Sequence, residues 1–387
     1  MVLKKIRGIN YMKKNFEQSY SEFISKFEMV GSSVIIADKN DILASCAYGK
    51  ESIEKNTPTR LDTIYRIASI SKVIVAIGVM KLVEEGQIDL DKDISDYLGF
   101  KVRNPHFPDD IITTKMVMTQ SSSICDDGDE TGGYDNANQI DDEIMLEDIL
   151  ANPNSKYYSS KTFMKHKPGS YWRYSNFGCG ILACLVERVS GEMFVEFIKD
   201  KLLHPLGIYS GFRLEDLKYP ENLASHYFYR NNKFILNRDY DSFKKVQCLK
   251  YKVGNNFRGV AGGLYISSLD LLKIMQMLMN KGIYKDIRIL KEETVIEMEK
   301  THWDGPTEDP TYYKKGLQMI ILDEFTKDPL KGHFGNAYGL RSFMLYNKNK
   351  GYIFLCNGAN FITDEEHMTI LQKETIEFLV DFSEEEK

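Results

Sequence analysis

Apolar side chains recur at helical spacing in two segments of the chain. Within residues 1–30 the apolar positions lie three or four residues apart, at Phe16, Tyr20, Phe23, Ile24 and Phe27. This spacing predicts an amphipathic helix. From Ser69 to Glu85 apolar residues occupy almost every face, and Gly86 follows as a helix-ending residue. A helix of this kind is buried, so we expect it at the centre of the molecule.

Strand-like runs occur near both ends of the chain. Two of them, 33–37 and 42–46, are joined by a polar turn at 38–41. Three more follow late in the sequence, at 317–322, 341–346 and 352–356. A final helix is predicted near 365–382.

The middle of the chain has a different pattern, with helices and long polar loops. Residues 128–141 are rich in Asp, Gly and Asn and are predicted to form an exposed loop. The terminal strands are expected to join one sheet in an α/β lobe, from about 30–75 and 258–387. A helical lobe is expected at about 76–257, with a site between the two lobes.

The composition fits a globular protein of enzyme size. Hydrophobic residues make up 43% and charged residues 27% of the 387 positions, which excludes wholesale disorder. A net charge of -6 without a long Lys/Arg run gives no basic face for nucleic acid. No stretch approaches the roughly 18 apolar residues of a membrane span, and no apolar run follows the basic start as in a secretory signal. We therefore expect a cytoplasmic protein as written, or an exported one if a leader was removed.

Cysteine and histidine show no metal-ligand spacing. The six cysteines form no C-x-x-C pair, so buried free thiols are expected. The seven histidines are scattered, without an H-E-x-x-H motif. We expect no metal and no other cofactor. The expected partner is a small-molecule or peptide substrate, and the oligomeric state is left open.

Ser69 and Lys72 are the first candidates for chemistry. Three positions apart on a helix, they share a face, so the amine can reach the serine hydroxyl. A buried helix start lowers the pKa of a lysine by desolvation and by the helix dipole, and its N–H groups can stabilise an oxyanion. The same spacing recurs in charged surroundings at Ser52/Lys55 and Ser242/Lys245. The alternative is that Ser69 only caps the helix.

Tyr174 and Asn176 form the second candidate pair. They follow a Pro-Gly turn and precede an apolar helical run, unlike the similar triplets at 134–136 and 229–231. A phenol beside the lysine could move a proton from the serine to the leaving group. Asn176 could contact the lysine and a substrate carbonyl. The alternative is a loop tyrosine that packs with Trp172.

The third candidate element is His333, Gly335 and Asn336, which directly precedes the late strands. A small residue such as Gly335 on a strand lets a substrate backbone lie close. The Asn336 N–H could complete an oxyanion hole with the Ser69 N–H. An ordinary structural role for His333 is the alternative.

Longer segments around these residues resemble the superfamily of penicillin-binding proteins and class C β-lactamases. Residues 63–72 are similar to its nucleophile segment, which carries S-x-x-K. Residues 168–178 are similar to its second motif, and 261–271 to the helix entry before its last motif. Residues 205–207 and 356–358 also agree, so the resemblance runs from about residue 30 to the end.

The resemblance implies an α+β fold, with an antiparallel sheet flanked by helices and an all-helical lobe. The whole chain, 1–387, would be one β-lactamase-like catalytic domain with its active site between the lobes. The catalytic residues would be Ser69, Lys72 and Tyr174, and the substrate-binding residues Asn176, His333, Gly335 and Asn336.

Two departures from the family pattern bear on the substrate. His333 stands where many β-lactamases have a lysine that holds a substrate carboxylate, and His-x-Gly is similar to what some peptidases and esterases of the superfamily carry. A neutral imidazole binds carboxylates weakly, so efficient β-lactamase action is not expected. Residues 117–123 also differ from the usual sequence of a loop that supports the site.

The expected function is hydrolysis of amide or ester bonds through a Ser69 acyl-enzyme. Expected substrates are D-amino-acid peptides, as for a D-Ala-D-Ala carboxypeptidase, or small esters. The alternatives are weak β-lactamase activity and a non-catalytic ligand-sensing or structural role on the same fold. A Ser–His–Asp hydrolase with His333 as base is a further alternative, but the chain has no G-x-S-x-G elbow.

Overall fold

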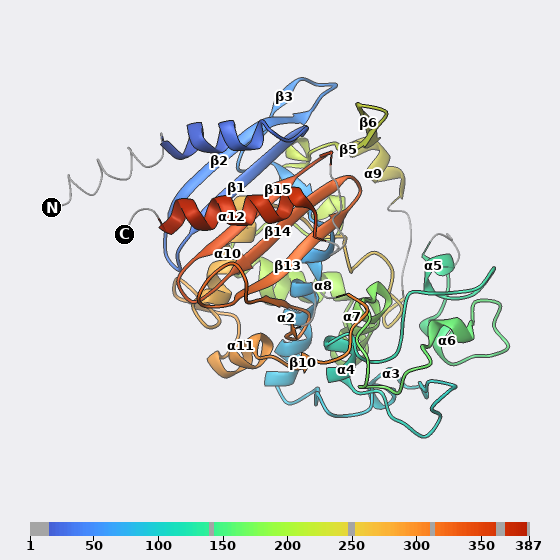
Figure 1. Ribbon diagram of the computed structural model, residues 1–387. Helices are drawn as coiled ribbons and strands as arrows, with labels where there is room; N and C mark the ends of the chain where they lie inside the picture. Colours follow the sequence, from blue (N-terminus) through green and yellow to red (C-terminus); the bar gives the residue numbers. More distant parts are fainter. Residues whose placement is uncertain (1–14, 139–142, 247–251, 310–313, 361–367, 385–387) are drawn as a thin grey trace.

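The computed structural model describes residues 15–138, 143–246, 252–309, 314–360 and 368–384. Within these residues its centre is an antiparallel sheet of nine strands (Figure 1). From edge to edge the strands are β10 (Trp303–Asp304), β11 (Lys314–Lys315), β12 (Ile320–Leu322), β13 (Leu330–Ala337), β14 (Leu340–Tyr346), β15 (Gly351–Cys356), β1 (Gly31–Ala37), β2 (Ile42–Ser52) and β3 (Thr57–Pro58). The first and last parts of the chain therefore meet at the pairing of β1 with β15.

Short strand pairs and helices surround this sheet. Three two-stranded pairs are β4 (Ile64–Arg66) with β7 (Tyr265–Ser267), β5 (His226–Arg230) with β6 (Lys233–Arg238), and β8 (Ile283–Tyr284) with β9 (Ile287–Arg288). Residues 15–24 are helical. The other α-helices are α2 (Ser71–Glu84), α3 (Ser95–Leu98), α4 (Thr114–Met118), α5 (Tyr134–Ala137), α6 (Leu146–Leu150), α7 (Asn176–Ser190), α8 (Phe194–Ile198), α9 (Tyr240–Val246), α10 (Ser268–Met279), α11 (Glu292–Glu299) and α12 (Ile370–Glu384).

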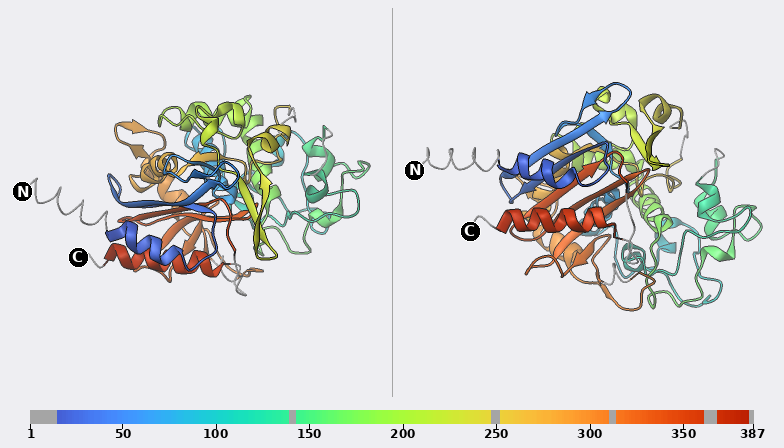
Figure 2. Two further views of the ribbon diagram at one scale, coloured as in Figure 1. Left: turned by 90° about the horizontal axis from the view of Figure 1, so that it is seen from above. Right: turned by 45° about the horizontal axis from the view of Figure 1, so that its top comes forward.

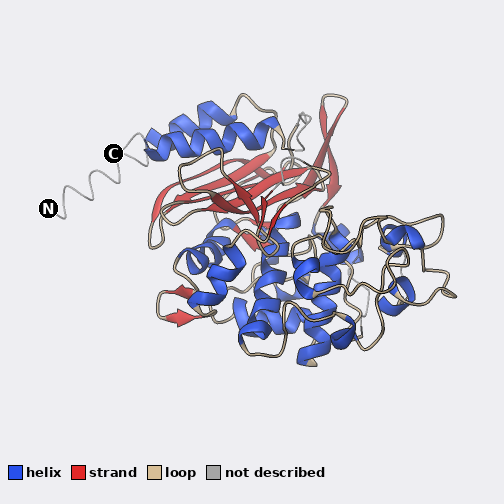
Figure 3. Cartoon of the chain, turned by 60° about the horizontal axis from the view of Figure 1, so that its bottom comes forward, coloured by secondary structure: helices blue, strands red, loops and turns tan. Residues whose placement is uncertain are grey.

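Helices cover both faces of the sheet (Figure 3). Successive strand residues point to opposite faces: Val34 belongs to the apolar cluster that includes the first helix and α12, while Ile35 belongs to the cluster that includes α2, α7 and α10. The first helix and α12 lie side by side (Figure 2), and the rings of Phe23 and Phe378 stack at 4.5 Å. Because both faces are buried, β15 is apolar at nearly every position. The predicted antiparallel sheet flanked by helices, with a helical region beside it, is confirmed.

Several predicted boundaries shift in the structure. Ser69 lies in a 3-10 turn, Ala68–Ile70, and α2 begins two residues later. The strand expected at 317–322 is shorter, because Gln318 has φ +55 and Gly316 N–H bonds to the Met319 carbonyl in a turn. The helix expected within residues 1–30 is seen over 15–24, and residues 1–14 lie outside the described ranges.

The loop predicted to be exposed at 128–141 contains α5 instead. Tyr134 is buried there and its ring stacks on Phe177 at 5.0 Å. Apolar contacts with α7, not the local composition, therefore decide the position of this segment; residues 139–142 lie outside the described ranges.

The described cysteines are free thiols, and the described helices are short or polar. The five described cysteines, Cys46, Cys125, Cys179, Cys184 and Cys356, are buried and free, and Cys248 lies outside the described residues. No helix in the described ranges is long and apolar enough to cross a bilayer.

Candidate active site

Ser69 is held in a tight turn between β4 and α2. The preceding Ala68 has φ +49, a left-handed conformation that costs a non-glycine residue on the order of 1 kcal/mol. The Ser71 hydroxyl fixes the turn by donating to the Ala68 carbonyl at 2.6 Å and accepting from the Leu264 N–H at 3.1 Å. The turn brings the Ser69 N–H to the start of α2, where backbone donors are not used by the helix.

Two polar groups meet at the Ser69 hydroxyl. Lys72 Nζ lies 3.0 Å from Ser69 Oγ, and the Tyr174 hydroxyl donates to the same oxygen at 2.7 Å. Lys72 Nζ also donates to Asn176 Oδ1 at 2.8 Å and to the Ala261 carbonyl at 3.2 Å. Four of the predicted site residues, from two motifs more than a hundred residues apart, thus form one hydrogen-bonded cluster.

Burial sets the charge of the two groups beside Ser69. Desolvation lowers the pKa of Lys72, which is fully buried, and the charge of Asp126 opposes this only in part. Desolvation raises the pKa of Tyr174, and its bond to Ser69 opposes this. The arrangement therefore favours a neutral amine that can accept a proton and a protonated phenol that can donate one.

Asp126 is a positioning residue that the sequence analysis missed. Its carboxylate accepts from the Asn176 N–H at 3.0 Å, Asn176 Nδ2 at 2.8 Å, the Phe177 N–H at 2.8 Å and the Ser175 hydroxyl at 3.0 Å. It caps the start of α7 and turns the Asn176 amide so that its oxygen faces Lys72. The signal that could have revealed it is the acidic pair Asp126-Asp127, since carboxylates are favoured at helix N-termini.

The third motif lies on β13, directly against the Ser69 turn. A Cβ atom at Gly335 would come within 2.5 Å of the Ile67 carbonyl oxygen, so only glycine allows this approach. The Asn336 side chain points to the other face of the sheet, where its Oδ1 accepts from Gln372 at 2.7 Å. Only the backbone of Asn336 can therefore serve the site.

His333 lies on the same face of β13 as Gly335 and is 1% exposed. Its Nδ1 lies 2.7 Å from the Phe334 carbonyl oxygen, which can only accept, so Nδ1 carries the proton. Burial, with nearby Lys315 and Lys72, holds the pKa of His333 well below its ordinary value. The imidazole is therefore neutral at neutral pH, and its Nε2 can only accept.

Lys315 is a second residue that the sequence analysis missed. It is fully buried in β11, and its Nζ lies 5.4 Å from the ring centre of Trp172. Burial, together with the charge of Lys72, lowers the pKa of Lys315 to about 7. Within the sequence, Lys314-Lys315 looks like an ordinary solvated pair, so no local signal marks it.

The segment 117–123, which departs from the family pattern, still supports the second motif. The Gln120 carbonyl accepts from the Arg173 N–H at 3.1 Å, and its side chain reaches the Ser175 carbonyl at 3.5 Å. Gln120 and Ser123 both have positive φ, +61 and +64. The loop thus reaches the Tyr174 segment through one backbone contact and one contact of the Gln120 side chain.

The repeated motifs elsewhere have local roles. The Ser52 hydroxyl faces Glu54 and the Lys55 N–H, and the Ser242 hydroxyl bonds to Asp239 at 2.5 Å. Because these two hydroxyls contact acidic side chains and a backbone N–H, the two serines are suitable controls for Ser69.

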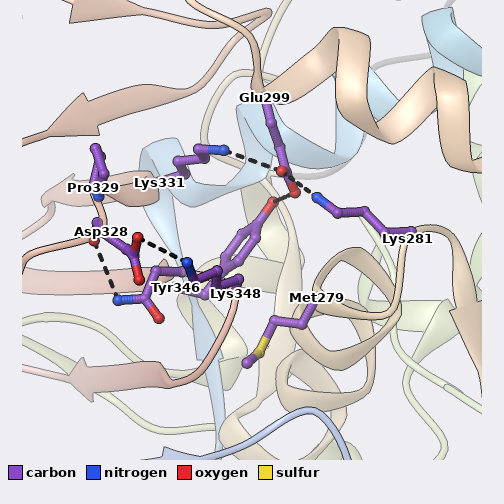
Figure 4. Close-up of a pocket in the computed structure, with 9 residues that line it drawn as sticks. Met279, Lys281, Glu299, Asp328, Pro329, Lys331, Tyr346 and Lys348 are labelled. Carbon is purple, nitrogen blue, oxygen red and sulfur yellow. Dashed lines mark hydrogen bonds and ion pairs between the residues drawn. The ribbon is translucent and has the colours of Figure 1, made fainter.

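A separate hollow of about 150 Å³ lies at the far end of β13 (Figure 4). There the nearly buried carboxylate of Glu299 contacts Lys281 Nζ at 2.6 Å, Lys331 Nζ at 3.2 Å and the Tyr346 hydroxyl at 3.1 Å. This network joins α11 to β13 and β14. Its donors are already directed at Glu299, which indicates a structural role.

Comparisons with known proteins show the family of the chain. The model of the Beta-lactamase family, described as Beta-lactamase, matches residues 16–376. Esterase EstB of Burkholderia gladioli is 30% identical over 192 residues, 49% of this chain and 48% of the esterase. Protein flp of Staphylococcus aureus (strain N315) is 24% identical over 205 residues, 52% of this chain and 38% of flp. The matches thus span about half or less of the length of these curated relatives.

Solved structures give the same result over a larger part of the chain. The octameric penicillin-binding protein homologue from Pyrococcus abyssi has 25% sequence identity and a TM-score of 0.68, covering 89% of this chain and 73% of that one. The family model covers most of the chain, including the segments that carry Ser69, Tyr174 and His333. This chain belongs to the Beta-lactamase family.

Proposed function

We propose that this protein hydrolyses small esters or amides, including D-amino-acid peptides, through an acyl-enzyme on Ser69. The observation that carries the proposal is the contact of Ser69 Oγ with both Lys72 Nζ, at 3.0 Å, and the Tyr174 hydroxyl, at 2.7 Å. A serine needs a neighbouring base to become a nucleophile, and the leaving group needs an acid. Lys72 supplies the base and Tyr174 supplies the acid.

In the proposed reaction the neutral Lys72 amine takes the Ser69 proton as Oγ attacks the substrate carbonyl carbon. The Ser69 and Asn336 N–H groups stabilise the oxyanion. The bond to the leaving oxygen or nitrogen then breaks, Tyr174 gives that atom its proton, and Lys72 returns a proton to Tyr174. Water releases the acyl group by the same steps with the water oxygen as nucleophile.

The neutral state of His333 weighs against efficient β-lactamase action, since the third motif offers a carboxylate no positive charge. It also weighs against a Ser–His–Asp mechanism, because Nδ1 is bound to a carbonyl and not to a carboxylate. Esterase EstB supports an ester substrate by analogy.

The test is intact-protein mass after incubation with a fluorescent penicillin or a 4-nitrophenyl ester, beside ester turnover. Ser69→Ala should remove both adduct and turnover, and Tyr174→Phe should lower kcat by roughly 100-fold or more. Ser52→Ala and Ser242→Ala should behave as wild type. Adducts on Ser69→Ala would overturn the assignment, and the absence of adduct and turnover in the wild type would favour the non-catalytic alternative.

A further inference from the structure

Arg66 is a positive group close to the proposed nucleophile that none of the three motifs includes. Its Nε donates to the Gly262 carbonyl at 3.2 Å, while the preceding carbonyl, of Ala261, accepts from Lys72 Nζ at 3.2 Å. Two consecutive carbonyls therefore anchor the guanidinium and the proposed base. Arg66 is the last residue of β4 and is partly exposed.

The ring of Tyr338 holds this guanidinium in place. Arg66 Cζ lies 4.2 Å from the ring centre, a cation–π contact, and the ring also stacks with His226 at 6.1 Å. A Cβ atom built on Gly262 would lie 3.4 Å from Ala68 Cα and 3.6 Å from the Tyr338 hydroxyl. The Tyr338 hydroxyl and the Ser69 turn thus both lie close to Gly262.

The turn that carries Tyr338 is strained. Tyr338 has φ +58 in the connection between β13 and β14, a left-handed conformation that is uncommon for a bulky residue. Such strain persists where the surrounding structure over-determines it, and here the contacts with Arg66 and His226 do so. The ring is thereby fixed next to the proposed site.

Within the described part of the chain, the charge of Arg66 has no acidic partner. Arg60, Arg103, Arg173 and Arg213 each pair with a carboxylate. Among the described residues, Arg66 forms no ion pair, and its two terminal amino groups make no hydrogen bond. Lys315 is another cation near the site, but it is fully buried. Arg66 is therefore a partly exposed cation near the site that a ligand can reach.

We propose that Arg66 binds a carboxylate of the substrate, with Tyr338 orienting the guanidinium. A carboxylate fits the two terminal amino groups of an arginine in a forked pair of hydrogen bonds. This inference rests on the proposed function and narrows its substrates to esters or amides that carry a free carboxylate. It gives the site the positive charge that the neutral His333 does not provide.

The test compares two pairs of esters, each with and without a free carboxylate. One pair is the mono-4-nitrophenyl ester of glutaric acid and its methyl ester; the other is an acylated 2-hydroxy acid and its methyl ester, so that both sides of the scissile bond are covered. Arg66→Gln should lower kcat/KM for the carboxylate member of at least one pair by roughly 10- to 100-fold, with little effect on the neutral member. The kcat/KM of Arg66→Lys for the carboxylate member should lie between those of wild type and Arg66→Gln, because lysine keeps the positive charge but not the two parallel donors.

Arg230→Gln is the matched control. Arg230 is exposed, and its guanidinium lies 5.1 Å from the ring centre of Phe228, so the variant loses the same charge and a similar contact away from Ser69. It should leave both pairs unchanged. The proposal is overturned if Arg66→Gln changes the two members of each pair equally or changes neither, in a protein whose melting temperature matches wild type.

A binding measurement separates failure of this inference from failure of the proposed function. If no ester is hydrolysed through Ser69, the proposed function fails. The carboxylate members should still raise the melting temperature of Ser69→Ala, and not that of Ser69→Ala/Arg66→Gln. Equal shifts of the melting temperature in both proteins would overturn the role of Arg66 without bearing on the proposed function. If Arg66→Gln does not fold, Tyr338→Ala replaces it, with a smaller expected loss on the same substrates.

Discussion

Replacing Asp126 by asparagine should disable the proposed site without touching its nucleophile. The carboxylate accepts four hydrogen bonds, at 2.8–3.0 Å, from Ser175, which precedes α7, and from the first two residues of the helix. An asparagine of the same shape has one accepting oxygen, and its amino group would face two of the four donors. Both Asn176 contacts go to one carboxylate oxygen, so Asn176 loses the contacts that hold its amide toward Lys72 when the new amino group takes the place of that oxygen.

The magnitude follows from these contacts. A hydrogen bond to a charged group contributes roughly 1.5–3 kcal/mol, and the losses within one cluster are not additive. With at least two bonds lost at a partly buried position, Asp126→Asn should lower the free energy of unfolding by about 2–4 kcal/mol. Misplacing Asn176 should lower kcat/KM by roughly 10- to 100-fold, which corresponds to one or two further hydrogen bonds.

The pH dependence gives a second, independent measurement. Lys72 acts as a base only when neutral, so activity falls as the pH drops through its pKa. Burial lowers the pKa of Lys72 and the charge of Asp126 raises it. Removing that charge lowers the pKa further, so the acidic limb of the kcat/KM profile should move to lower pH.

The assay is ester hydrolysis from pH 5 to 9, beside urea unfolding, for Asp126→Asn and its neighbour Asp127→Asn. Asp127 pairs with Arg173 at 2.7 and 2.9 Å and touches none of the proposed catalytic groups. Its variant should keep the acidic limb in place. An acidic limb of Asp126→Asn that stays fixed or moves to higher pH, or an unchanged stability, would refute the reasoning.

Two further predictions concern buried groups that do not contact Ser69. Burial lowers the pKa of His226 from 6.5 to about 3, so the unfolded chain binds the proton more readily and stability is lost as the pH falls through this range. Between pH 7 and 4.5, His226→Phe should therefore lose less stability than the wild type in urea unfolding. An identical loss in the two proteins would contradict this. Glu299→Gln leaves two lysines facing a neutral amide, so thermal or urea unfolding should show a loss of roughly 1–3 kcal/mol with kcat/KM nearly unchanged. A large loss of activity at unchanged stability would instead connect Glu299 to the reaction.

The elements with strong local patterns could be predicted from the sequence. The apolar run after Ser69 becomes α2, and the late runs become β14 and β15, because an element buried on every side must be apolar on every side. Ser69 and Lys72 are three residues apart, a spacing that brings them together where the 3-10 turn at Ser69 continues into α2. Predictions failed where distant contacts outweigh composition, as for Tyr134 in α5.

The charges and partners in the candidate site depend on the tertiary structure. Asp126 reaches Asn176 across 50 residues of chain, and Arg66 reaches the Gly262 carbonyl across 196. Protonation depends on desolvation, which exists only after β11, β13 and α2 have packed; the neutral state of His333 is therefore invisible in its sequence neighbours. The sequence by itself determined which chemical groups the chain carries and which helix positions the first two, whereas packing decided which groups meet, which are charged and which remain open to a substrate.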